Sequence, residues 1–197
     1  MYQPYSVNLD EISEYNIRKS TINHKKAVLI VIDMQETFRS IISDTLIENI
    51  KKMIKHAETN GTKVIFTRHN DHFPQSKSLM KWWDGQSLEK DSDSWQIIKE
   101  LDPAGRTIID KNQYSAFFDT NLNDILQKDG IEDVIITGVM TNCCCETTSR
   151  DAFQLGYRVF FINDATSTDN KDLHLSTLKT LSYGFAYIQN TNNVIAE

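Results

Sequence analysis

The chain has 197 residues, of which 40% are hydrophobic and 24% charged, and its formal net charge is −6 at pH 7. A chain of this length holds one sizeable hydrophobic core but not two comfortable domains, and the composition is that of an ordinary globular protein. The acidic balance argues against nucleic acid or an anionic membrane as a partner, since both favour basic surfaces.

Targeting signals are the next feature that the sequence bears on. No run approaches the roughly 18 apolar residues of a membrane span. The stretch MYQPYSVNLDEISEYNIRK (1–19) is polar and lacks the apolar region of a signal peptide. We therefore expect a cytoplasmic protein that does not bind membranes.

Short runs rich in β-branched residues alternate with helix-like segments along residues 26–197, after a polar leader, 1–25, that we expect to pack on this single domain. The predicted strands are 27–33, 63–67, 107–111, 133–139, 158–164 and 185–190. The predicted helices, with apolar residues three and four positions apart, are 43–61, 121–130, 141–156 and 170–184, and they close on Gly61, Gly130, Gly156 and Gly184. Apolar strands that alternate with helices predict a Rossmann-like, three-layer α/β/α sandwich with a mainly parallel, roughly six-stranded sheet.

The region 70–103 departs from this alternation. It is long and polar, and it contains Trp82, Trp83 and Trp95. We expect it to be an excursion over the functional edge of the sheet.

Three reactive groups follow three predicted strands. Asp33 ends the first strand, Lys111 ends the third, and the cysteines Cys143 to Cys145 open the helix after the fourth. Ligands of open α/β sheets bind at the carboxyl ends of the strands, so these groups can meet there. A thiolate is a nucleophile, a nearby ammonium favours it, and a carboxylate can take the thiol proton. The alternatives are that Asp33 caps a turn, that Lys111 is solvated, and that the thiols are small core residues.

The three adjacent thiols do not suit a disulfide, because consecutive cysteines form one only with strained geometry. Helical spacing puts Cys145 on one stripe with Ser149, Ala152 and Phe153, so we expect it to pack inward. Cys143 and Cys144 point about 100° apart in a helix, so only one of them is expected to face a common site. Spacing alone does not say which.

Four motifs occur in order along the chain: VLIVIDMQETF (28–38), KNQYSAFFDTNL (111–122), TGVMTNCCCETTSRDAF (137–153) and DATSTDNKDLH (164–174). On these motifs the chain resembles the isochorismatase-like cysteine hydrolases over roughly residues 26–190. That family includes nicotinamidases, ureidoacrylate and carbamoyl-amide hydrolases, and isochorismatases proper.

The resemblance implies a hydrolase that cleaves a small amide or ureide C–N bond. It implies Cys144 as the nucleophile, Asp33 as the general base and Lys111 as the cation that lowers the thiol pKa. It also implies an oxyanion hole formed by the backbone N–H groups of Met140 and Cys144, with a cis peptide bond between Val139 and Met140.

Metal dependence is a point on which the sequence departs from nicotinamidases, which carry a D-W-H-P motif with a second histidine shortly after. The equivalent stretch here, RHNDHFPQS (68–76), has Phe73 in place of the first metal histidine. The spacing of His69, Asp71 and His72 does not favour a metal site. We therefore expect no metal and no cofactor, and nicotinamide is disfavoured as a substrate.

Two other functions stay open. The stretch HLSTLKTLSYGFAYIQNT (174–191) resembles isochorismatases proper, which cleave a vinyl ether by protonation from the aspartate and need no cysteine. A catalytically inactive binding module is the other alternative, although the presence of all three reactive groups argues against it.

The expected substrate is a small organic molecule in a pocket with aromatic walls. The candidates for its walls are Phe38, Arg68, His69, Trp83, Tyr114 and Phe118. Arg68 could pair with a substrate carboxylate or form a surface ion pair, and for each tryptophan packing of the excursion is an equal alternative. The resemblance also implies a homo-oligomer, a dimer or a tetramer.

Overall fold

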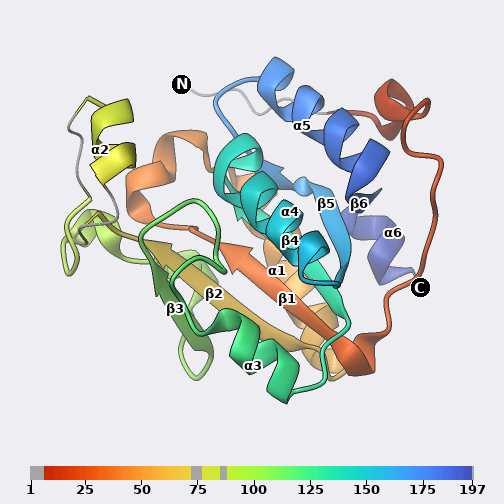
Figure 1. The fold of residues 1–197 in the computed structure, drawn as a ribbon, viewed down its shortest axis with the longest axis horizontal. Coiled ribbons are helices and arrows are strands. Elements are labelled where there is room, and N and C mark those ends of the chain that lie inside the picture. The colour runs from red at the N-terminus through yellow and green to blue at the C-terminus, as the bar shows by residue number, and fades with distance from the viewer. Residues whose placement is uncertain (1–6, 72–76, 85–87, 197) are drawn as a thin grey trace.

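A computed structural model describes residues 7–71, 77–84 and 88–196. Within them six strands form one sheet in the order β3-β2-β1-β4-β5-β6 (Figure 1). The strands are β1 (Ala27–Ile32), β2 (Lys63–His69), β3 (Thr107–Lys111), β4 (Asp133–Val139), β5 (Arg158–Ser167) and β6 (Ala186–Gln189). All five pairings between them are parallel, so the prediction of a six-stranded parallel α/β sandwich is confirmed.

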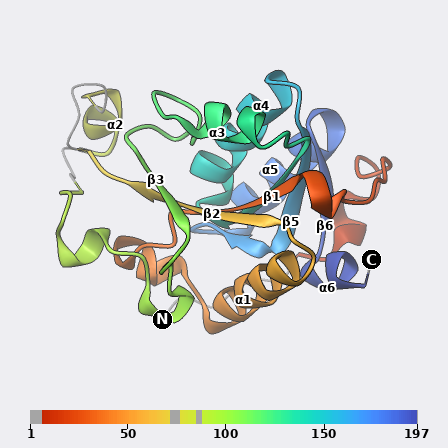
Figure 2. The same ribbon diagram turned by 90° about the horizontal axis from the view of Figure 1, so that it is seen from below.

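Helices cover both faces of this sheet. They are α1 (Asp44–Thr59), α2 (Lys77–Trp82), α3 (Leu122–Lys128), α4 (Glu146–Gln154), α5 (Lys171–Gly184) and α6 (Thr191–Ile195). Helices α1 and α6 pack on one face, and α3, α4 and α5 pack on the other (Figure 2). Within the described ranges, none of the helices combines the length and the apolar character that crossing a bilayer requires.

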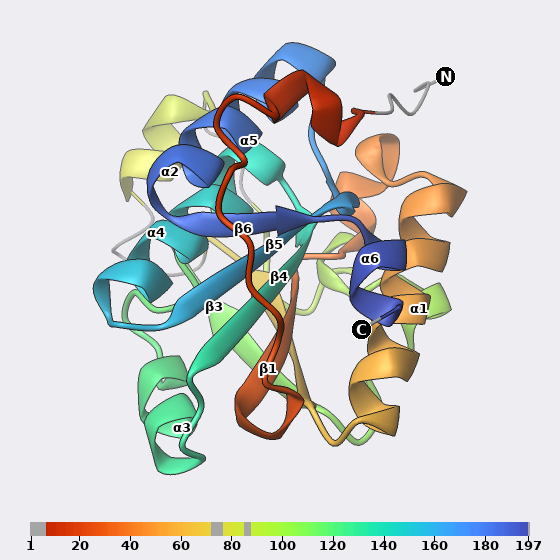
Figure 3. The same cartoon turned by 90° about the vertical axis from the view of Figure 1, so that its right-hand side faces the viewer.

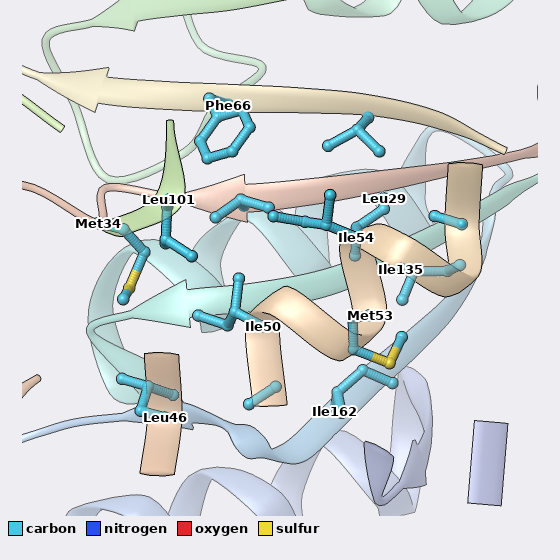
Figure 4. Close-up of a cluster of buried hydrophobic side chains, with 14 of the residues drawn as sticks. Leu29, Met34, Leu46, Ile50, Met53, Ile54, Phe66, Leu101, Ile135 and Ile162 are labelled. Atoms are coloured by element: carbon cyan, nitrogen blue, oxygen red, sulfur yellow. The ribbon is translucent and has the colours of Figure 1, made fainter. Parts of the chain in front are cut away.

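Helix α1 shows how the sequence pattern produces the packing. The side chain of Ser43 accepts a hydrogen bond from the backbone N–H of Leu46 and so caps the helix start. Apolar residues then recur on one stripe, and Ile50 and Met53 pack against Leu29 of the sheet (Figure 4). Each fully buried side chain of this kind stabilises the fold by about 1.5–3 kcal/mol.

Each of the four predicted helices ends at its predicted glycine or within two residues of it. Gly61, Gly130 and Gly156 have φ angles of 74°, 65° and 95°, the left-handed conformation typical of a residue just past a helix. Gly184 is the last residue of α5, so the predicted helix end is confirmed there as well, and Phe185, with φ −137°, follows it. Strand β6 begins directly after Phe185.

The order of the strands places the ligand-binding edge. From β1 the chain winds outward to β2 and β3, then returns to the other side of β1 to form β4, β5 and β6. The carboxyl ends of β1 and β4 therefore form the topological switch point at which open α/β sheets bind ligands. Helix α2, part of the predicted excursion, lies beyond the end of β2 (Figure 1).

The N-terminal segment lies along the outer strand β6 (Figure 3). The Asn16 side chain donates a hydrogen bond to the carbonyl of Ile188 at 3.1 Å, and the Gln189 side chain donates one to the carbonyl of Ser20 at 3.2 Å. Ile12 is fully buried. A covered edge strand offers fewer unpaired backbone groups for aggregation.

Candidate active site

The structure brings the side chains of Asp33, Lys111 and Cys144 together at the switch point. Lys111 Nζ lies 2.7 Å from Asp33 Oδ2 and 3.3 Å from Cys144 Sγ. It also donates a hydrogen bond to the carbonyl of Gln113 at 2.9 Å. Two hydrogen bonds and an ion pair therefore fix the position of the lysine head group.

Asp33 is held by its own backbone and by the neighbouring strand. Its φ of 46° lies in the left-handed region, which aspartate tolerates better than most residues. The Thr67 hydroxyl of β2 accepts a hydrogen bond from the Asp33 N–H at 3.1 Å and donates one to Asp33 Oδ1 at 2.5 Å. Thr67 was not predicted from the sequence, where its only signal is a hydroxyl at the end of the apolar run KVIFT.

Strand β4 approaches β1 closely just before the cysteines. Gly138 has φ 110°, and a Cβ at this position would collide with the carbonyl oxygen of Ile32, so only glycine fits. The peptide bond between Val139 and Met140 is cis, as the resemblance implies.

The thiols lie in a π-helical turn, Thr141–Cys145, that precedes α4. The carbonyl of Met140 accepts hydrogen bonds from the N–H groups of both Cys143 and Cys145, each at 3.1 Å. The wider turn changes the directions expected from 3.6-residue spacing. Cys143 and Cys144 both line the same cavity, so the expectation that only one would face the site was wrong.

The predicted inward stripe of α4 holds for three of its four members. Cys145, Ser149 and Ala152 are fully buried. Phe153 is 47% exposed, so its assignment to the stripe was wrong. Its ring instead packs edge-on against Phe185, with ring centroids 5.4 Å apart.

Burial dominates the electrostatics of these groups. It raises the pKa of the Cys144 thiol well above its usual range; the charge of Lys111 lowers that pKa, and Asp33 raises it. Lys111 thus acts in the direction that the resemblance implies, but burial outweighs it. Burial also lowers the pKa of Lys111, but the charges of Asp33 and Cys144 raise it by more, so the net pKa lies above the usual value of a lysine. The resting site therefore holds a neutral thiol beside a charged ammonium.

A cavity of about 370 Å³ opens in front of Cys144. Its walls include the predicted residues Phe38, His69, Trp83, Tyr114 and Met140, together with Cys143 and Cys144. They also include Thr37, Asp71, Leu79, Leu88 and Asp169, which were not predicted as wall residues from the sequence. The side chains of Asp33 and Lys111 are 0% exposed and do not line the cavity, so Cys144 is the member of the trio that forms part of its wall.

Two predicted wall residues lie elsewhere. Arg68 pairs with Asp110, with 2.9 Å between Nε and Oδ1, and its guanidinium lies 3.7 Å above the Trp95 ring. Successive side chains of a strand point to opposite faces, so Arg68 turns away from the face that His69 occupies. Phe118 is 52% exposed and does not line the cavity.

The excursion is linked to the cavity wall through Trp83. Its indole N–H donates a hydrogen bond to the Tyr114 hydroxyl at 3.0 Å. Tyr114 lines the cavity together with Cys143. Trp82, which is 77% exposed, takes no part in this wall.

His69 is fixed by two partners, Gln35 and Asp71. The Gln35 side chain donates to the His69 carbonyl at 3.0 Å and accepts from its N–H at 2.8 Å. His69 Nε2 lies 3.0 Å from Asp71 Oδ1 and must donate, because a carboxylate only accepts. Within the described residues, the buried Nδ1 of His69 has no hydrogen-bond partner.

The described residues do not provide a metal site at this position. They contain no cluster of three histidine, cysteine, aspartate or glutamate side chains arranged to hold an ion. Asp71 Oδ1 accepts from His69, and Oδ2 accepts from the Leu88 N–H at 2.9 Å. Burial raises the pKa of Asp71, but these hydrogen bonds outweigh it and the net pKa is lowered. His72, the third residue of the sequence-level candidate, lies outside the described residues.

Comparison with known proteins adds to this geometry. Residues 27–193 match the sequence model of the isochorismatase domain. The chain is 41% identical over 179 residues to nicotinamidase 3 of Arabidopsis thaliana, and the aligned region covers 89% of this chain and 90% of that protein. It is 28% identical over 203 residues to the ureidoacrylate amidohydrolase RutB of Acinetobacter baylyi, and this alignment covers 87% of this chain and 83% of that protein. The structure superposes on a cysteine hydrolase from Pseudomonas syringae pv. phaseolicola 1448A with a TM-score of 0.83 at 26% identity. The superposition covers 90% of this chain and 94% of that protein.

Proposed function

The chain belongs to the isochorismatase family of hydrolases, and from this premise we propose that it hydrolyses the C–N bond of a small, neutral carboxamide through a thioester on Cys144. One observation carries the proposal. The Cys144 thiol faces the cavity, while Lys111 lies 3.3 Å from the sulfur and 2.7 Å from Asp33 behind it. The names of the two relatives, a nicotinamidase and a ureidoacrylate amidohydrolase, support amide or ureide chemistry.

The first step uses the neutral thiol of the resting site. Asp33 takes the proton from Cys144 as the sulfur attacks the substrate carbonyl carbon, and the new thiolate character is stabilised by the Lys111 ammonium. The transfer happens in the attack itself, because burial holds the thiol pKa too high for a standing thiolate. A raised pKa of Lys111 keeps the ammonium charged throughout.

The second step breaks the C–N bond. The backbone N–H groups of Met140 and Cys144 hold the negative oxygen of the tetrahedral intermediate, a contribution commonly worth about 3 kcal/mol. Asp33 returns its proton to the leaving nitrogen, which departs as ammonia or an amine. Water, deprotonated by Asp33, then attacks the thioester and releases the carboxylic acid and the free thiol.

The charges of the cavity favour a neutral substrate. Its described walls carry the carboxylates of Asp71 and Asp169 and no lysine or arginine. Arg68, the one candidate partner for a substrate carboxylate, is paired with Asp110 outside the cavity. Isochorismate carries two carboxylates, so this arrangement disfavours the vinyl-ether alternative. It favours an aromatic amide such as nicotinamide, which the missing metal motif had disfavoured at the level of sequence.

A substrate panel tests this proposal. We expect kcat/KM for nicotinamide, a neutral amide, to exceed that for ureidoacrylate and isochorismate by at least about tenfold, since burying an unpaired carboxylate beside like charges is costly. Ammonia release measures the first two reactions, and pyruvate release measures the third. Faster cleavage of isochorismate would overturn the proposal, and turnover of none of the three would favour a binding module.

His69 is proposed to hydrogen-bond the substrate through Nδ1. In the tautomer with its proton on Nε2, which donates to Asp71, Nδ1 is an acceptor, and a substrate N–H is a matching donor. Replacing His69 with leucine is expected to raise KM for the preferred amide about tenfold, the value of one hydrogen bond of about 1.4 kcal/mol. Steady-state kinetics measure the change. Arg68→Gln, one residue earlier on the same strand and facing away, is the matched control; equal KM values for wild type and His69→Leu would contradict the assignment.

A further inference from the structure

A buried histidine contacts the Met140–Cys145 turn, which carries the proposed oxyanion-hole amides, and does not line the cavity. His174 of α5 is 2% exposed, and both ring nitrogens have partners. Nδ1 lies 2.9 Å from the Thr141 hydroxyl, and Nε2 lies 2.9 Å from Asn163 Oδ1. Thr141 is fully buried and directly follows Met140. The ring therefore ties α5 and β5 to the turn that carries the thiols.

The direction of each hydrogen bond follows from Asn163. Its side-chain nitrogen donates to the carbonyl of Val7 at 2.9 Å and to Asn190 Oδ1 at 2.8 Å, so Oδ1 of Asn163 is the acceptor for His174 Nε2. Burial lowers the pKa of His174 to about 4, so the ring is neutral near pH 7 and carries one proton, on Nε2. Nδ1 is then an acceptor, and the Thr141 hydroxyl donates to it.

We propose that His174 is a positioning residue for catalysis: by accepting the Thr141 hydroxyl hydrogen bond it fixes the Met140–Cys145 turn and thereby the two oxyanion-hole amides. This inference rests on the proposed function. A second side-chain hydrogen bond, of 2.5 Å from the Thr168 hydroxyl to Asn142 Oδ1, also anchors the turn. His174 acts through Thr141, because neither residue lines the cavity.

The effect is confined to the transition state. The amides of the turn meet the oxygen of the substrate most strongly when it becomes negative, so a turn that shifts loses oxyanion stabilisation and little ground-state binding. A displacement of about 1 Å in such a group can lower the rate roughly 100-fold. We therefore expect kcat to fall while KM stays almost constant.

Two substitutions of His174 separate its two hydrogen bonds. In His174→Asn the amide oxygen takes the position of Nδ1 and keeps the acceptor for Thr141; in His174→Gln the amide nitrogen takes the position of Nε2 and keeps the donor for Asn163. Each variant loses one buried hydrogen bond, so their melting temperatures should fall by similar amounts. We expect kcat of His174→Gln to fall roughly 10- to 100-fold and kcat of His174→Asn to fall at least about fivefold less.

Thr141→Val tests the same contact from the other side. It should lower kcat as much as His174→Gln does, with KM within about twofold of the wild type. The double variant Thr141→Val, His174→Gln should fall no further, because both changes remove one interaction. Equal kcat losses in His174→Asn and His174→Gln, additive losses in the double variant, or losses that appear in KM would overturn the inference.

Cys144→Ala, assayed in parallel on the same substrate, distinguishes a failure of the positioning role of His174 from a failure of the proposed function. If Cys144→Ala is inactive and His174→Gln has wild-type kcat, the positioning role fails and the proposed function stands. If Cys144→Ala keeps its activity, the thioester route fails, and the positioning role that rests on it fails with it.

Discussion

Replacing Cys144 with alanine is expected to lower kcat for carboxamide hydrolysis by at least about 10⁴-fold, because the variant has no atom that can form the thioester. Cys144 is the only one of the three proposed catalytic side chains that lines the cavity, since Asp33 and Lys111 are fully buried behind it. Ammonia release measures the rate. Intact mass spectrometry after rapid acid quenching should detect the acyl-enzyme in the wild type and not in the variant.

Cys145→Ala is the matched control for this experiment. Cys145 is the next residue, is fully buried among apolar side chains and does not line the cavity, so its replacement by a small residue should leave hydrolysis nearly intact. Retained amide hydrolysis in Cys144→Ala would contradict the thioester route. A variant that loses amide hydrolysis and keeps vinyl-ether cleavage would show that Asp33 serves both reactions, and Asp33→Ala should then damage both.

The architecture could be predicted from the sequence because its signal is local. Strand β1, AVLIVI, is apolar at every position, and the helix that follows it, α1, has an apolar stripe. The convergence of Asp33, Lys111 and the thiols also followed, since parallel strands bring their carboxyl ends to one edge. These inferences need only the order of the elements and not the directions of individual side chains.

The parts of the site that the sequence did not predict depend on those directions. The π-helical turn at Thr141–Cys145 brings a second thiol into the cavity, and no spacing rule for an α-helix predicts it. Thr67, which fixes Asp33, comes from a neighbouring strand and becomes visible only once the register of β1 and β2 is known. The raised pKa of Cys144 depends on complete burial, which a sequence motif does not report.

Neutralising one member of the buried ion pair is expected to destabilise the fold strongly. Lys111→Met leaves the Asp33 carboxylate without its ammonium, and Asp33→Asn leaves Lys111 without its carboxylate; each should lower the free energy of unfolding by about 3–5 kcal/mol. The double variant removes both charges, and it should recover most of that loss. All three should lose hydrolysis by at least about 10³-fold, since base and cation are both required. Urea unfolding and ammonia release measure the two quantities.

The same variants should move the reactivity of Cys144 in opposite directions, which separates a catalytic pair from a purely structural one. Asp33 raises the thiol pKa and Lys111 lowers it, so Asp33→Asn should lower the pKa and Lys111→Met should raise it. Alkylation by iodoacetamide at pH 7, followed by peptide mapping to Cys144, should therefore be faster than wild type in Asp33→Asn and slower in Lys111→Met. Asp33→Asn would then hold a more reactive sulfur and yet turn over less substrate, because it has no group to protonate the leaving nitrogen. Equal alkylation rates in the two variants would show that neither charge is coupled to the thiol, and the roles proposed for both would fall.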